Sequence, residues 1–389
     1  MKEKLWTKDY ILDIVNNLLV AVVFYIFIVY TTTMAIGDFS ASVSEAGLAA
    51  SFFIVGALVL RIFTGRHMDA IGRKKMLVAS SVLYAASTLS FHFIDSLTVL
   101  YLVRFFQGTA YGVSSTVMAT AVAVSVPAKR RGEGIGFFTL SLTLASAIGP
   151  FLGITLPQIN EMYLLYLCDL LVLAIIICSV SLQVPESAEK ENTAGKPFSL
   201  SNFIELSVLP IASISLLCTI GYSAVMTYIG AYSASMGLFL GGSLFYVAYS
   251  AACLIFRPLS GIALDRYGNN FVMLPILVMT ILGFAVISIA DTNAALLIGA
   301  VCLGVGYGTI PSACSAIAVQ KLDKNRFGLA TATVFMSLDI GNGTGPHLLG
   351  MIEPVYGFSA VYAAGAMASA CALFAYFVTM YKRKQKCVQ

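Results

Sequence analysis

The sequence predicts an all-α integral membrane protein with twelve transmembrane helices in two pseudo-symmetric six-helix bundles. Its composition, the spacing of its apolar runs and an internal repeat carry this prediction. Only 11% of the 389 residues are charged and 59% are hydrophobic, with a mean hydropathy of +0.88, whereas a soluble domain has about 25% charged residues. A helix crosses the hydrocarbon core of a membrane with about 20 mostly apolar residues, because it satisfies its backbone amides internally. The chain has room for about twelve such segments.

Apolar runs between charged or Gly/Pro-marked breaks predict six helices in each half. They are expected at 11–34, 45–64, 76–94, 97–124, 134–156 and 162–182, then at 206–231, 241–264, 271–290, 294–319, 328–350 and 358–381. The first run lacks a small-residue cleavage site, so we expect a retained helix and not a signal peptide. The polar stretch 183–205 is the expected cytoplasmic linker between an N-terminal bundle at 1–182 and a C-terminal bundle at 206–389, which ends in a short basic tail.

The distribution of lysine and arginine predicts the orientation. Loops on one side of the membrane, and both ends of the chain, carry these residues, whereas the loops expected on the other side carry none. Because basic residues are enriched in cytoplasmic loops, both termini are expected in the cytoplasm. The net charge of +4 therefore reflects topology and not a nucleic-acid partner. Short loops favour a bacterial cell membrane.

No chemistry-bearing cluster points to an enzyme. The eight cysteines show no metal-ligand spacing, and buried thiols behave as small apolar side chains. The sequence contains nothing similar to a nucleotide-binding loop or a nucleophile triad. We therefore expect no enzyme activity, no metal, no cofactor and no use of ATP.

Four motifs of the first half recur in order 196 residues later. Arg61-x3-Gly65-x3-Asp69-x2-Gly72 returns as Arg257-x3-Gly261-x3-Asp265-x2-Gly268, Gly108-x2-Tyr111-Gly112 as Gly304-x2-Tyr307-Gly308, Arg130-x-Gly132 as Arg326-x-Gly328, and Gly149-Pro150 as Gly345-Pro346. Several matches at one offset indicate two homologous bundles. Parallel repeats of this kind build one large class of transporters.

The sequence resembles the major facilitator superfamily over nearly its whole length. Residues 65–74 are similar to the superfamily's signature loop, although Ala70 stands where a basic residue is usual. In the second copy, Asn269 and Asn270 replace the basic residues. Residues 102–108 resemble the family's helix 4 motif. Residues 145–153 resemble the helix 5 motif of antiporters, although Ala145 and Ile154 stand where glycine is usual. The pattern around Arg257, Asp265, Asp339 and Gly341 also resembles drug-efflux and sugar-efflux permeases of twelve helices.

The resemblance implies that the signature loop gates transport. Asp69 would interact with the start of the expected helix 328–350, near Arg326. Asp265 would interact with the start of the expected helix 134–156, near Arg130, since a carboxylate is stabilised at a helix N-terminus. Closing this latch would stabilise the outward-facing state; the alternative is a charged loop that only sets topology. The gating set is Arg61, Gly65, Asp69, Gly72, Arg73, Lys74, Arg257, Gly261, Asp265, Arg266 and Gly268.

Glycine-proline pairs and membrane charges are further candidates. Gly149-Pro150 and Gly345-Pro346 are expected to kink their helices and hinge the cavity, or simply to allow close packing. Placing a charged side chain inside the membrane costs free energy, so a charged residue there is a candidate for a functional role. A carboxyl group removed from water can bind and release protons as a cavity opens to alternate sides. The candidates for proton coupling are Asp339, Arg104, Asp13 and Asp169.

Each coupling candidate has a structural alternative. Arg104 could instead be a hydrogen-bond hub to Gln107, and Asp339 could make an interhelical hydrogen bond. For Asp13 and Asp169 the structural role is favoured, because they lie near the interface and on a peripheral helix. The resemblance implies a coupling role for Arg104.

Aromatic, amide and thioether side chains on the central helices predict an adaptable cavity for an amphiphilic compound. Packing is the alternative role for each of them. The predicted lining is Asn16, Asn17, Phe24, Gln107, Tyr111, Tyr222, Met226, Tyr228 and Tyr307.

We expect a monomeric secondary active exporter, with small-molecule substrate, protons and membrane lipid as partners and the proton gradient as energy source. Lipophilic drugs are the first substrate class. A dedicated exporter of one metabolite, such as a sugar, a metallophore or an amino-acid derivative, is the alternative. A lipid flippase and a non-transporting sensor remain open.

Overall fold

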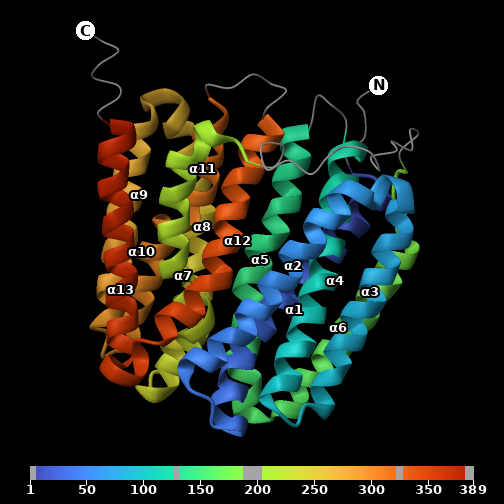
Figure 1. Cartoon of the computed structure of the whole chain (residues 1–389), viewed down its shortest axis with the longest axis horizontal. Helices are drawn as coiled ribbons and strands as arrows, with labels where there is room; N and C mark the ends of the chain where they lie inside the picture. Colours follow the sequence, from blue (N-terminus) through green and yellow to red (C-terminus); the bar gives the residue numbers. More distant parts are fainter. Residues whose placement is uncertain (1–5, 127–130, 187–203, 321–326, 382–389) are drawn as a thin grey trace. The chain divides into compact units, whose positions relative to one another are not determined.

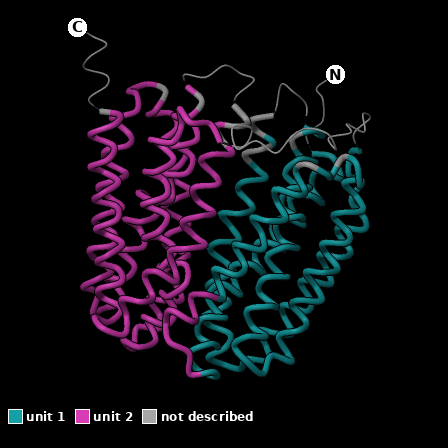
Figure 2. The backbone as a smooth tube through the Cα atoms, viewed as in Figure 1, with its two compact units in different colours: residues 1–39, 49–196 teal, residues 40–48, 197–389 magenta. Residues whose placement is uncertain are grey.

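The computed structural model describes residues 6–126, 131–186, 204–320 and 327–381. All regular structure in these ranges is helical, which confirms the predicted fold class (Figure 1). The chain divides into two compact units: residues 1–39 with 49–196, here unit 1, and residues 40–48 with 197–389, here unit 2 (Figure 2). Within the described residues, ten helices are long and apolar enough to cross a membrane.

Unit 1 contains the helices of the first half of the chain. They are α1 Lys8–Phe39, α2 Val43–Ile71, α3 Arg73–Leu89, α4 Leu97–Ser125, α5 Arg131–Ile159 and α6 Glu161–Ser181, with a 3-10 turn Ser90–Phe93 after α3. The first residues of α2, 43–48, belong to unit 2. Each predicted helix of this half is present, and its ends lie within a few residues of the expected ones, except for longer extensions in α1 and α2.

Unit 2 contains the remaining helices. They are α7 Leu209–Ser235, α8 Phe239–Tyr267, α9 Asn269–Ser288, α10 Asn293–Val305, α11 Ile310–Val319, α12 Phe327–Gly350 and α13 Glu353–Tyr376, with 3-10 turns at Leu206–Val208 and Tyr307–Thr309 and a π turn at Phe377–Tyr381.

The segment predicted over 294–319 is present as the span Asn293–Ala318, but the helix is interrupted after Val305. Gly306 has φ −76° and ψ −89°, and the 3-10 turn Tyr307–Thr309 separates α10 from α11. A Cβ at position 306 would lie 2.5 Å from the Thr280 nitrogen of α9, so a close backbone approach fixes this site. Pro311 also lacks the N–H that would continue the helical hydrogen bonds. The apolar pattern carries no sign of this break.

Glycines of the repeated motifs bring the helices of each unit into backbone contact. A Cβ at Gly108 would lie 1.9 Å from the Phe53 carbonyl oxygen, and one at Gly304 would lie 2.4 Å from that of Tyr249. The helix pairs α2–α4 and α8–α10 therefore meet in the same way. The internal repeat of the sequence thus corresponds to a repeated packing geometry within each bundle.

Two further repeated glycines end helices. Gly72 follows α2 with φ 105°, and Gly268 follows α8 with φ 80°. These left-handed conformations favour glycine, because a side chain would clash with the backbone. The positive φ angles thus explain why glycine stands at the end of both signature loops.

At one end of unit 1, charged side chains make hydrogen bonds to the ends of α3 and α6. The Lys74 ammonium donates to the carbonyls of Ser179 and Val180, both at 2.7 Å, and of Leu182, at the C-terminus of α6. The Glu186 carboxylate accepts from the backbone N–H of Arg73 at 2.9 Å and of Lys74 at 3.0 Å, at the N-terminus of α3. A cation at a helix C-terminus and an anion at an N-terminus both match the helix dipole.

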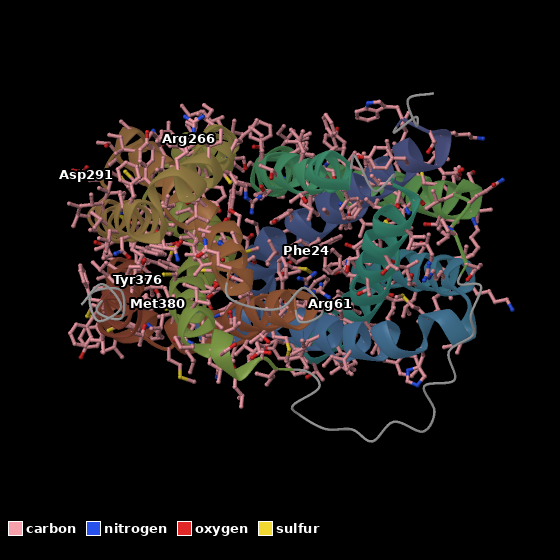
Figure 3. The ribbon with its side chains drawn as sticks, turned by 90° about the horizontal axis from the view of Figure 1, so that it is seen from above. Phe24, Arg61, Arg266, Asp291, Tyr376 and Met380 are labelled. Atoms are coloured by element: carbon pink, nitrogen blue, oxygen red, sulfur yellow. The ribbon has the colours of Figure 1, made fainter. Side chains whose placement is uncertain are left out.

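Unit 2 closes the equivalent end without charge. Asn270 stands 196 residues after Lys74, and its side-chain oxygen accepts from the Tyr376 hydroxyl of α13 at 2.7 Å. Asn269 exchanges two hydrogen bonds with Gln320, at 3.0 and 3.1 Å. Figure 3 shows Tyr376 next to Met380 at this end of α13. Asn269 and Asn270, which replace the basic residues of the signature loop, thus make neutral hydrogen bonds at this end of unit 2.

We expect Lys74→Met to lower the stability of the protein by about 1–2 kcal/mol, because the carbonyls at the end of α6 lose a charged donor. Lys75→Met is the matched control, since Lys75 is exposed and carries the same charge. Chemical denaturation in detergent measures both variants. Equal stability of the two variants would contradict the assigned role of Lys74.

Candidate functional site

Three aromatic rings from different helices of unit 1 form one cluster. Phe24 of α1, which is labelled in a view along the helices (Figure 3), stacks on Tyr111 of α4 with ring centroids 5.0 Å apart. Phe53 of α2 lies 5.0 Å from Phe24 and 5.4 Å from Tyr111. We call Phe24, Phe53 and Tyr111 the first triad.

Unit 2 contains a matching cluster of three tyrosines. Tyr222 of α7 stacks on Tyr307 with centroids 3.9 Å apart, and on Tyr249 of α8 at 5.3 Å. The hydroxyls of Tyr307 and Thr219 lie 3.3 Å apart. We call Tyr222, Tyr249 and Tyr307 the second triad.

The two triads occupy equivalent places in the repeat. Phe53 and Tyr249, like Tyr111 and Tyr307, are 196 residues apart. For α1 and α7 the offset is 198, because Gly149 packs on the Val22 carbonyl where Gly345 packs on that of Ile220. This offset pairs Phe24 with Tyr222. Sequence analysis named four of the six rings and missed Phe53 and Tyr249, which the 196-residue offset could have revealed.

Arg104 of α4 is fully buried beside the first triad. Its Nη1 donates to the Gln107 Oε1 at 2.5 Å, and the Gln107 Nε2 donates to the Thr88 hydroxyl at 3.1 Å. The guanidinium carbon lies 4.4 Å from the centre of the Phe53 ring. Nε and Nη2 have no hydrogen-bond partner among the described residues. The Gln107 contact is the structural alternative considered above, but it occupies only one of the three guanidinium nitrogens.

Asp13 is also buried, at 2% exposure, on α1. Its Oδ1 has no hydrogen-bond partner in the described part of the chain, and the same is true of the Asn16 Oδ1. The Asn16 amide donates to the Ser179 hydroxyl at 2.9 Å, and that of Asn17 to the Ser141 hydroxyl at 2.8 Å. Both asparagines thus bond within the bundle.

The other two acids have different surroundings. Asp169 of α6 lies 2.9 Å from the His92 Nε2, and both side chains are partly exposed. Asp339 is half-buried on α12 and interacts with neighbouring groups. Among the four coupling candidates, Asp13 is therefore the acid that combines burial with an oxygen lacking a described partner.

The sequence model of one transporter family covers nearly the whole chain. The Major Facilitator Superfamily model matches residues 14–247 and 239–387. The chain belongs to this superfamily. It is thus a multi-pass membrane transporter and not an enzyme.

Individual members of the superfamily resemble the chain at low identity. An uncharacterised transporter of Methanocaldococcus jannaschii is 26% identical, over 84% of this chain and 86% of its own. The staphylopine export protein of Staphylococcus aureus is 23% identical, over 84% of each chain. The crystal structure of the nucleoside transporter NupG, as a D323A mutant, shares the fold with a TM-score of 0.75 and 16% identity, over 95% of this chain and all of that one.

The structure describes only some of the superfamily's signature residues. The side chains of Asp69 and Asp265, and residues Arg130 and Arg326, lie outside the described part of the structure, so the predicted latches stay predictions. Arg61 and Arg257 are half-buried and Arg266 is exposed. Gly65 and Gly261 have open space where a side chain would stand.

The remaining lining candidates lie on α7. Met226 is buried, and the Tyr228 hydroxyl donates to the carbonyls of Val43 at 3.0 Å and Pro346 at 2.5 Å. Tyr228 thus has structural partners within unit 2. The pairs Gly149-Pro150 and Gly345-Pro346 lie inside α5 and α12, where each glycine lets its helix approach α1 or α7 closely.

Proposed function

We propose that this superfamily member exports a small amphiphilic organic compound from the cytoplasm in exchange for protons, by alternating access. The observation that carries the proposal is the buried Asp13 carboxyl group, which has an oxygen without a described partner. A carboxyl group in such surroundings is suited to take up a proton and to release it when its solvation changes. The proton gradient is then the energy source.

The two aromatic triads support an amphiphilic substrate. Each brings together rings of phenylalanine or tyrosine inside a bundle, and ligand sites combine such apolar groups with a few polar ones. The triads stand at equivalent positions in the two bundles, as expected for transporters built from internal repeats. Lipophilic and aromatic compounds are therefore the first class to test.

Export, rather than import, is supported by two observations. The helix 5 motif around Gly149 resembles that of antiporters, and the staphylopine export protein is a relative over most of both chains. The same relative favours the second candidate function, which is export of one dedicated metabolite. The positive-inside distribution supports cytoplasmic termini and insertion in the cell membrane.

Flux in proteoliposomes tests the proposal. We expect lipophilic compounds, aromatic acids or metallophores to cause proton movement in wild-type vesicles with an imposed pH gradient. Asp13→Asn is expected to abolish this movement, because the amide cannot release a proton. Asp169→Asn is the matched control, and is expected to keep it because His92 already pairs with Asp169.

Three results would redirect the assignment. Loss of proton movement in Asp339→Asn, with Asp13→Asn active, would place the coupling acid on α12. Substrate flux without proton movement in any variant would contradict antiport and favour a uniporter or a flippase. Binding without flux would favour a sensor.

A further inference from the structure

The charge of Arg104 has no counter-charge in the described structure. The side chain is completely buried, and no described carboxylate forms an ion pair with it. Burying a cation without a partner costs several kcal/mol, and such charges persist when an anion or a set of hydrogen bonds compensates them. One hydrogen bond to Gln107 and one ring face of Phe53 are the compensation found here.

One edge of the buried guanidinium has no hydrogen-bond partner among the described residues. Gln107 accepts from Nη1, and Thr88 holds Gln107 in place. Nε and Nη2, the two nitrogens without a described partner, share the opposite edge. Their N–H groups point in parallel, which is the geometry that binds two oxygens of a carboxylate or phosphate.

The Phe53 ring links this edge to the first triad. Phe53 contacts both the guanidinium and the rings of Phe24 and Tyr111. A compound with an acidic group on an aromatic or apolar body matches this combination, because charge and ring surface are adjacent. Unit 2 has Ala300 at the position equivalent to Arg104, so the repeat provides one such edge and not a symmetric pair.

We propose that the Nε/Nη2 edge of Arg104 binds the carboxylate or phosphate group of the transported compound, whose apolar body packs on the first triad. The proposal rests on the transport function proposed above and narrows its substrate class to amphiphilic anions. Lipophilic cations, which the aromatic lining alone would admit, are disfavoured by the buried positive charge. The substrate therefore carries a single acidic group at one end.

A series of probes with one aromatic body and different charge tests this assignment. Calorimetry on the full-length protein in lipid nanodiscs compares 2-naphthoate, 2-naphthyl phosphate, neutral 2-naphthamide and 2-naphthylmethylammonium. We expect one of the two anions to bind about tenfold or more tightly than the amide, because the charge-assisted pair of hydrogen bonds is lost with the amide. The better anion distinguishes carboxylate from phosphate recognition.

Variants then assign the preference to Arg104. Arg104→Gln is expected to bring the affinities for anion and amide within about threefold, while Arg104→Lys keeps part of the preference, because it retains charge but not the bidentate edge. Lys75→Gln, which removes an exposed cation of the same unit, is the control and should keep the wild-type ratio.

Equal or tighter binding of the amide or the ammonium compound by the wild type overturns the proposal, as does absence of binding by both anions. An anion preference that survives in Arg104→Gln also overturns it. The wild-type series decides the first two points even if Arg104→Gln does not fold. The assay uses no pH gradient, so loss of proton coupling with an intact anion preference counts against the transport mechanism alone.

Discussion

Gly108→Ala is expected to prevent folding of unit 1 or to destabilise it by more than about 3 kcal/mol. The new methyl group would lie 1.9 Å from the Phe53 carbonyl oxygen and 2.9 Å from the Phe53 Cα. Both are backbone atoms, so no side-chain rotation can relieve the overlap, and α4 must move away from α2. Yield of monodisperse protein and its melting temperature measure the effect.

Gly37→Ala is the matched control, because a Cβ there would have no atom within 4 Å. Alanine has the higher helix propensity by about 1 kcal/mol, so this variant should be as stable as the wild type or more stable. A melting temperature of Gly108→Ala within about 2 °C of the wild type would show that α2 and α4 do not meet as described.

Tyr222→Ala is the second substitution with a large expected effect. The Tyr222 ring stacks on both Tyr307 and Tyr249, and its side chain is only 5% exposed. Its removal leaves a cavity and is expected to cost about 3–5 kcal/mol of stability. Because the second triad loses its central ring, we also expect transport to fall at least about tenfold.

Tyr222→Phe separates the ring from the hydroxyl. It keeps both stacking contacts, so stability and flux should stay close to the wild type, within about 1 kcal/mol and a factor of about three. Equilibrium unfolding and proteoliposome flux measure both variants side by side. If both variants keep the stability and flux of the wild type, the triad contributes neither packing nor a binding surface.

The fold could be predicted because a membrane leaves few solutions. An apolar run of sufficient length must be a helix, so hydropathy locates each segment without knowledge of its neighbours. Helix ends were less predictable, since they depend on local partners such as the Asn160 side chain that accepts from the Met162 N–H at the start of α6. Pro311, which favours the break near Gly306, is visible in the sequence, but the contact of Gly306 with Thr280 on another helix is not.

The site was predictable where residues stand out chemically. Arg104 and Asp13 are conspicuous because charges are rare in apolar runs. Phe53 and Tyr249 are not, because aromatic residues occur throughout the chain; their 196-residue offset is the one sign in the sequence, and the packing of Gly108 and Gly304 shows their place. The pairing of Asp169 with His92, 77 residues away in sequence, likewise depends on how α6 packs on α3.

The different closures at the ends of the two units make the halves unequally sensitive to ionic strength. Lys74 and Glu186 carry full charges, and the attraction of such charges to helix ends weakens as the ionic strength rises. Asn270 and Tyr376 meet through a neutral hydrogen bond, which salt affects little. We therefore expect the two halves, which share one repeat, to respond differently to the ionic strength of the surrounding solution.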